Sequence, residues 1–353
     1  MQSRSFLILF TAVLIMVALL YTQPNDPWQG QQQLILPGLS TVLNDVERVT
    51  VIGAGNQPIA TLVRGDDNWM VEERDGYRAD VGRIRRNLIA LGNAKVVELK
   101  TTDPALHARL GVEDLASPDA AGKQFIVEAP GETFALIVGN TGVRGGMSYV
   151  RRPDAAQSFL VSAELDPGET TTDWLSRKVL DIDSARVHAV TISHADGEVL
   201  RVEKAAPDAT EYALADMPDG RELQYPKILD SMPDLLTNLE MDDVSEAEPM
   251  GDGKPVASNR FETFDGLIVE VDVFDTSDGQ RAAIRVSADE SLADRFTPTD
   301  GAENATGDQI SFAAVADETR ELNARLDGWL YALPSFKLDQ LTRRTDDLLK
   351  PLE

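Results

Sequence analysis

The chain has 353 residues, enough for two or three ordinary domains, and hydrophobic residues make up 42% of it, which is enough to fill real cores. Lysine and arginine number 33 against 59 aspartate and glutamate, a formal net charge of -26 that makes nucleic acid and anionic lipid headgroups poor partners. The lack of cysteine excludes disulfides, zinc thiolate sites, iron-sulfur clusters and a lipidated cysteine, and leaves the compartment open.

The first predicted element is a membrane anchor at residues 1–22. Residues 6–21 are apolar apart from Thr11, and no later stretch is comparably apolar. A helix over this segment is about 27 Å long, which is short but adequate for a hydrocarbon core of about 30 Å. Because no small-x-small cleavage site follows it, we expect an uncleaved single-pass anchor rather than a signal peptide.

The basic residues around this segment predict its orientation. Arg4 and the free amino terminus precede the segment, and the first basic residue after it is Arg48. By the positive-inside rule the N-terminus is cytoplasmic, so the bulk of the chain is expected in the periplasm, held at the inner membrane.

Residues 23–45 are predicted to form a tether between the anchor and the folded part. Pro24, Pro27 and Pro37 flank a glutamine-rich centre, a composition that favours an extended chain over a folded element.

A first α+β repeat is predicted over residues 46–183. It begins with three short antiparallel strands (46–51, 59–63 and 69–71), an amphipathic helix (79–96) and a short helix that ends at Gly111 (103–110). A hairpin (124–128 with 133–138), two strands (147–152 and 158–162) and a helix (171–179) follow. In the amphipathic helix Val81, Ile84 and Leu88 recur at spacings of three and four, the period of a helix with one buried face.

A second α+β repeat is predicted over residues 184–353, in the same order. Residues 187–192 align without gaps to 46–51, and Asp196-Gly197 supplies a hairpin turn. The later elements are a strand (212–214), an amphipathic helix that tolerates Pro233 (228–235) and a hairpin that we match to residues 124–138 (267–274 with 281–286). A strand (328–333) and a helix (337–349) end the repeat. The fold class is therefore α+β, with two tandem repeats that each pack helices on a mainly antiparallel sheet.

The strand at residues 49–53 leads into Gly53-Ala54-Gly55, which resembles the opening of a dinucleotide-binding loop. That loop needs a third small residue and a following helix, whereas Pro58 and the strand-like residues 59–63 follow here. A hairpin is the better interpretation. The glycine-rich residues 139–146 lack the Gly-Lys-Ser/Thr ending of a phosphate loop and are interpreted as a turn.

The polar candidates predict no metal or catalytic site. His188 and His194 lie on one face of a predicted strand, but about 20 Å apart, too far to share a metal. His194 beside Asp196 is interpreted as a solvated turn histidine rather than an acid-base pair. Five acids lie in loops that contain glycine but lack the spacing of a calcium loop (Asp275, Asp278, Asp300, Glu303, Asp308).

Five aromatic residues could stack on a sugar or a peptide, but they recur at equivalent repeat positions and are interpreted as core and corner packing (Trp69, Tyr77, Trp174, Trp329, Tyr331). The sequence thus predicts no catalytic residue, no cofactor and no metal, and it leaves a binding site unknown.

The sequence resembles a bacterial domain-of-unknown-function family numbered 4340. The resemblance rests on the single N-terminal span and on five short patterns spread over the rest of the chain (69–71, 77–80, 110–114, 146–151, 328–334). It implies an envelope protein encoded beside a gliding-motility-type ABC transporter, and it carries over no catalytic residues.

We therefore expect a membrane-anchored, periplasm-facing, non-enzymatic accessory or scaffold protein of an ABC-type transport complex. Its expected partners are the membrane or periplasmic subunits of the transporter and the lipid bilayer, through the N-terminal helix. The alternative is a periplasmic module that binds a glycan or peptide in a cleft between the repeats. A hydrolase has the least support.

Overall fold

The computed structural model describes residues 33–143, 145–225, 227–247, 253–296 and 311–351. The predicted anchor lies outside these residues. Among the helices that the structure describes, none combines the length and the apolar character needed to cross a membrane.

The chain forms two compact units. Of the described residues, the first unit takes 33–46, 51–57 and 86–167, and the second takes 47–50, 58–85 and 168–351. The predicted limits of the two repeats, 46–183 and 184–353, stay a prediction.

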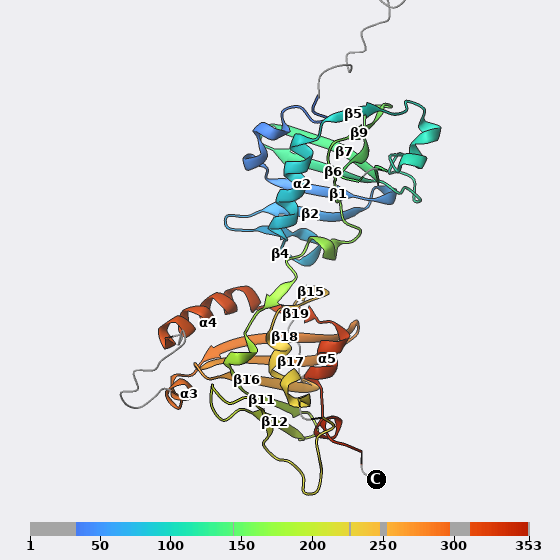
Figure 1. The fold of residues 1–353 in the computed structure, drawn as a ribbon. Helices are drawn as coiled ribbons and strands as arrows, with labels where there is room; N and C mark the ends of the chain where they lie inside the picture. The colour runs from blue at the N-terminus through green and yellow to red at the C-terminus, as the bar shows by residue number, and fades with distance from the viewer. Residues whose placement is uncertain (1–32, 144, 226, 248–252, 297–310, 352–353) are drawn as a thin grey trace, which may run out of the picture. The chain divides into compact units, whose positions relative to one another are not determined.

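Two large sheets dominate the fold (Figure 1). The nine-stranded sheet has the order β4-β3-β2-β1-β6-β7-β8-β9-β5. Its strands are β1 (Arg48–Ile52), β2 (Pro58–Arg64), β3 (Trp69–Val71), β4 (Tyr77–Arg78), β5 (Val96–Leu99), β6 (Lys123–Ala129), β7 (Glu132–Thr141), β8 (Ser148–Arg151) and β9 (Ser158–Val161).

The eight-stranded sheet has the order β13-β12-β11-β16-β17-β18-β19-β15. Its strands are β11 (Val187–His194), β12 (Val199–Glu203), β13 (Ala213–Leu214), β15 (Asp243–Glu246), β16 (Ala257–Thr263), β17 (Leu267–Thr276), β18 (Gly279–Ala288) and β19 (Trp329–Ala332). A separate pair joins β10 (Lys178–Leu180) to β14 (Leu239–Glu240).

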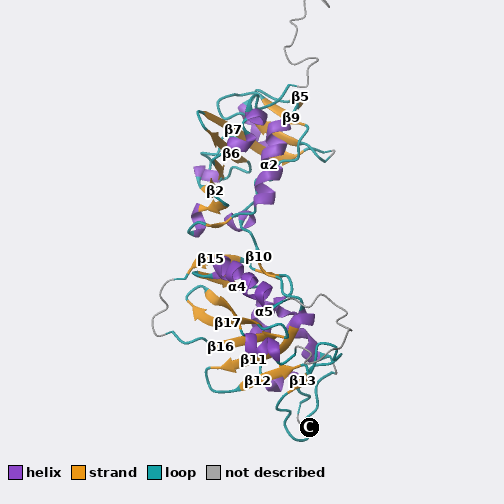
Figure 2. Cartoon of the chain, turned by 90° about the vertical axis from the view of Figure 1, so that its left-hand side faces the viewer, coloured by secondary structure: helices purple, strands orange, loops and turns teal. Residues whose placement is uncertain are grey.

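In the part of the chain that the structure describes, helices are few beside the strands, as Figure 2 shows by colour. They are α2 (Val81–Asn93), α3 (Glu290–Asp294), α4 (Phe312–Leu326) and α5 (Ser335–Leu341), with short 3-10 helices between other elements. Helix α4 packs on β18, where the Asn323 side chain accepts from the Val286 N–H at 3.0 Å and donates to the Val286 carbonyl at 2.7 Å. The α+β class with large antiparallel sheets is confirmed.

Alternation along the strands explains why the second sheet has one apolar face. In β16 Ala257, Asn259, Phe261 and Thr263 are buried, and the residues between them are partly exposed. Because successive side chains point to opposite faces, burial of one set fixes the register of the whole strand.

The two sheets have the same strand order once β4 is set aside. Raising each remaining strand number of the first sheet by ten gives the order of the second. By this order β16 and β17 correspond to β6 and β7. The sequence pattern matches the 267–286 hairpin to residues 124–138, whereas the strand order makes the β16–β17 hairpin the counterpart of those residues. The match is displaced by one strand because the sequence pattern does not predict β16.

Most predicted elements of the first half are confirmed, including the first three strands, the β6–β7 hairpin and the short helix that ends at Gly111. The amphipathic helix is confirmed but ends at Asn93, and residues 96–99 form β5 instead of its last turn. The described part of the predicted tether differs from expectation, because it contains two 3-10 helices and buries Ile35, Leu36 and Leu39.

Three predicted helices are corrected. The predicted helix 171–179 is a 3-10 helix, η6 (Thr171–Trp174), followed by extended chain whose Ser176 N–H bonds to the Arg78 carbonyl. The helix expected at 228–235 is split into η8 (Ile228–Ser231) and η9 (Pro233–Leu236), since Pro233 has no N–H to continue a helix. The helix expected at 337–349 is α5 followed by η10 (Thr345–Leu348).

Candidate functional site

The Gly53 to Gly55 loop is a hairpin turn, as the sequence predicts. Its backbone donors are occupied, because the Gly55 N–H bonds to the Ser117 carbonyl and the Asn56 N–H to the Leu115 carbonyl, both at 3.0 Å. A phosphate-binding loop must leave such N–H groups for the ligand. The loop therefore cannot cradle a phosphate in this conformation.

All three histidines contact backbone carbonyls. His188 Nδ1 lies 2.7 Å from the Lys204 carbonyl, and His107 Nε2 lies 2.8 Å from the Ala156 carbonyl. His194 is buried, with Nε2 at 3.1 Å from the Arg343 carbonyl, so its interpretation as a solvated turn residue is wrong. These contacts give each ring a structural role.

Two of the five loop acids are described. Asp275, which lies in strand β17, accepts from the Gln280 side chain at 3.0 Å, and Asp278 lies in the turn between β17 and β18. Asp300, Glu303 and Asp308 lie outside the described residues. Within the described part of the chain, no three histidine or acidic side chains group in a way that could hold a metal ion.

The aromatic residues pack inside the second unit, as expected. The Tyr77 ring stands edge-on to Trp329 at 4.9 Å and to Tyr331 at 6.3 Å between ring centroids. Burial raises the pKa of both tyrosines, so both phenols are neutral. Trp174 is fully buried, whereas Trp69 is partly exposed.

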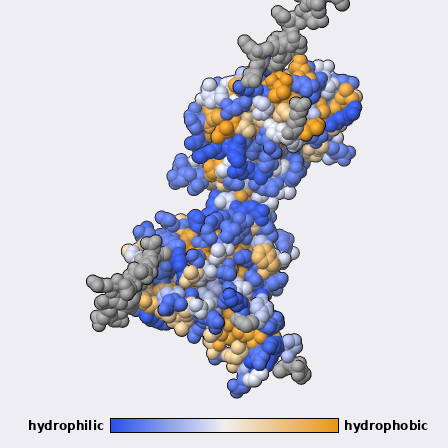
Figure 3. Space-filling model, in the orientation of Figure 1, coloured by the Kyte–Doolittle hydropathy of each residue, from blue (hydrophilic) through white to orange (hydrophobic). Residues whose placement is uncertain are grey.

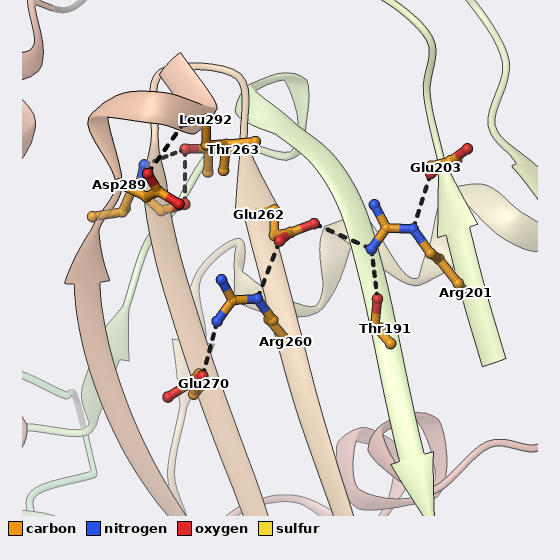
Figure 4. Close-up of polar contacts among 10 residues, drawn as sticks. Thr191, Arg201, Glu203, Arg260, Glu262, Thr263, Glu270, Asp289 and Leu292 are labelled. Carbon is orange, nitrogen blue, oxygen red and sulfur yellow. Dashed lines mark hydrogen bonds and ion pairs between the residues drawn. The ribbon is translucent and has the colours of Figure 1, made fainter. Parts of the chain in front are cut away.

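A charged ladder crosses the partly exposed face of the second sheet (Figure 4). Glu262 accepts from Arg201 and from Arg260, each at 3.1 Å, and Arg260 also donates to Glu270 at 2.9 Å. Burial alone would raise the pKa of Glu262, but the hydrogen bonds from Arg260 and Arg201 hold it below its usual value. Arg201 also donates to Glu203 at 2.9 Å, so each charged side chain of the ladder is paired and the ladder offers no free reactive group.

The best candidate for an interaction site is the outer edge of β5 in the first unit, which we call the β5 edge. Strand β5 ends the sheet order and pairs on its inner side with β9. On its outer side, within the described residues, the chain that leads in from the N-terminus (residues 33–45, the lead-in segment) pairs with the start of β5. The Val96 N–H bonds to the Gln33 carbonyl at 2.8 Å, and the Ile35 N–H to the Ala94 carbonyl at 2.9 Å.

An apolar side chain and a hollow mark this edge. The β5–β9 register slips between Val96 and Glu98, so Val97 is the bulged residue, and this residue is 55% exposed. Hydrophobic residues gather around β5 in Figure 3. A hollow of about 600 Å³ adjoins the edge, lined by Asn93, Lys95, Val96, Val97 and Ser162.

A second hollow of about 360 Å³ is lined in part by the lead-in segment. Its walls come from the lead-in segment, the start of β7 and the loop after β8 (Ile35, Leu36, Pro37; Thr133, Phe134, Ala135; Arg152, Pro153, Asp154). The second hollow therefore adjoins the lead-in segment directly, and the first is lined by Val96, whose N–H bonds to Gln33 in that segment.

Sequence reasoning missed the β5 edge because it placed residue 96 at the end of a helix. The run Val96-Val97-Glu98-Leu99 after the helix, with two β-branched residues, was the available signal for a strand.

Residues 69–257 match the sequence model of a protein family that is described as Domain of unknown function (DUF4340). No curated protein and no solved structure matches the chain.

Proposed function

The chain belongs to the DUF4340 family, and from this premise we propose that it is a membrane-anchored, periplasm-facing accessory or scaffold protein of an ABC-type transport complex. In this role the protein catalyses nothing and acts by holding transporter subunits at the inner membrane. The partner class comes from the family resemblance and the location from the predicted anchor.

The observation that carries the proposal is the pairing of the lead-in segment with β5. Folded structure begins by Gln33, where backbone bonds tie the chain to Val96. Between the end of the predicted anchor, at Thr22, and Gln33 the chain spans at most about 40 Å even when fully extended. The first unit would therefore stay close to the bilayer, within reach of a membrane-embedded partner.

We also propose that the two sheets arose by tandem duplication. Their common strand order supports this, and so do the segments that close each repeat. The 3-10 helices η6 and η10 are followed by matching backbone bonds, from the Ser176 N–H to the Arg78 carbonyl at 3.0 Å and from the Lys350 N–H to the Glu222 carbonyl at 2.8 Å. At the start of both helices an aspartate accepts from the backbone N–H of the residue before the helix, Asp173 from Thr170 and Asp347 from Arg344, each at 2.9 Å.

Purification from membranes under mild detergent tests the proposed function. We expect ABC transporter subunits to be recovered with the full chain in constant ratio. Repeated recovery of the chain without any transporter subunit would contradict it. A matched preparation from cells that lack the chain identifies subunits that bind the resin alone.

A further inference from the structure

In the second unit, the strand that corresponds to β5 carries an acid that binds an arginine. Strand β15 ends the sheet order, and its first residue is Asp243. Arg74 Nε donates to Asp243 Oδ1 at 2.7 Å, and its Nη2 donates to Oδ2 at 3.1 Å. Such two-point contact fixes the orientation of the guanidinium as well as its position.

The residues just before β15 make the same kind of backbone hydrogen bond as the residue that begins β5. The Met241 N–H bonds to the Arg177 carbonyl at 3.0 Å, just as the Val96 N–H bonds to the Gln33 carbonyl. Two residues after Met241 comes Asp243, and two residues after Val96 comes Glu98. Glu98 therefore occupies in the first sheet the place that Asp243 occupies in the second.

Glu98 is accessible to a partner. Its side chain is 58% exposed, and its neighbour Val97 is 55% exposed beside the hollow of about 600 Å³. Within the described part of the chain its cationic partner is Lys100, at 2.7 Å. A carboxylate can hold two cations at once, as Glu262 does with Arg201 and Arg260 (Figure 4).

We propose that the β5 edge binds an arginine on a loop of a transport-complex subunit, with Glu98 accepting it as Asp243 accepts Arg74. Apolar side chains of the same loop pack on Val97 and in the adjoining hollow. The net charge of -26 draws a basic loop toward the chain at long range. This inference rests on the proposed function and names the chemistry of the partner surface.

The test uses the full chain in native membranes, with a photoreactive amino acid in place of Val97, and measures the yield of crosslinked transporter subunits. We expect Glu98→Arg to lower this yield by about tenfold or more, and Glu98→Gln to lower it several-fold, because a carboxylate contact with arginine is lost. Asp119→Arg reverses a different exposed acid of the same unit and should leave the yield unchanged.

The outcomes separate the two proposals. Transporter crosslinks that persist within about twofold in both Glu98 variants overturn the arginine site and leave the scaffold role standing. A crosslink to a second copy of this chain in place of a transporter subunit also overturns the arginine site. Failure to recover transporter subunits in the unvaried chain, by crosslinking and by mild-detergent purification alike, overturns the scaffold role itself.

Discussion

Removing the Arg186 guanidinium tests how the second unit holds α4. Arg186 donates through Nη1 and Nη2 to the two carboxylate oxygens of Glu318 on α4 at 3.0 and 2.8 Å, and through Nε to Asp265 at 2.9 Å. The three side chains are only 19%, 30% and 12% exposed, respectively. Arg186→Ala would leave two partly buried carboxylates without their cation.

The expected loss follows from this burial. Breaking a fully buried pair costs about 3–5 kcal/mol, and an exposed pair contributes about 0–1 kcal/mol. For the partial exposure here we expect Arg186→Ala to lower the free energy of unfolding by about 2–3 kcal/mol, measured by denaturant titration of the purified protein.

The matched control is Arg320→Ala on the same helix. Arg320 pairs with Asp317 one turn away, and its side chain is 76% exposed, so the change should cost no more than about 0.5 kcal/mol. A denaturation midpoint for Arg186→Ala that equals the Arg320→Ala midpoint would refute the reasoning. A double-mutant cycle with Glu318→Ala should show the coupling directly.

Three further predictions concern stability. Leu39→Ala should cost about 2–4 kcal/mol of unfolding free energy because Leu39 is fully buried, whereas Leu43→Ala, at a partly exposed site, should cost clearly less; equal losses would mean that the lead-in segment is not part of the core. Gly139→Ala should lower the melting temperature, because an added Cβ would stand 2.2 Å from the Leu110 carbonyl oxygen; an unchanged melting temperature would contradict this packing. The lowered pKa of Glu262 means that the unfolded state binds its proton first as pH falls. The stability it contributes is therefore full above about pH 4.5 and is lost below it, and Glu262→Gln should flatten the pH dependence of the denaturation midpoint between pH 6 and pH 3.

The sequence predicts well the elements that depend on local pattern. The period of Val81, Ile84 and Leu88 predicts α2, and Asp196-Gly197 predicts the β11–β12 turn, because each pattern is satisfied within a few residues. Helix α4 was not predicted, although Val315, Leu322 and Leu326 are its buried residues, because the spacing of seven between the first two is a weak period.

Elements that depend on distant pairing were misjudged for a physical reason. Residues 175–176 are extended because they pair with the chain around Ala79, and that pairing cannot be seen in the local composition. The candidate site also depends on pairing between distant parts of the chain. The importance of Glu98 emerges only when β5 is found at the end of the sheet and compared with β15.

Photo-crosslinking in native membranes tests the central claim most directly, with a probe at Val97 on the β5 edge and a matched probe at Val199 on β12. Both valines are 55% exposed, so the two probes are equally accessible to chance contacts. The scaffold role predicts that the Val97 probe captures ABC transporter subunits well above the level of the Val199 probe. Capture of no transporter subunit at Val97, or of no more than at Val199, together with mild-detergent purification that recovers no transporter subunit, would contradict it.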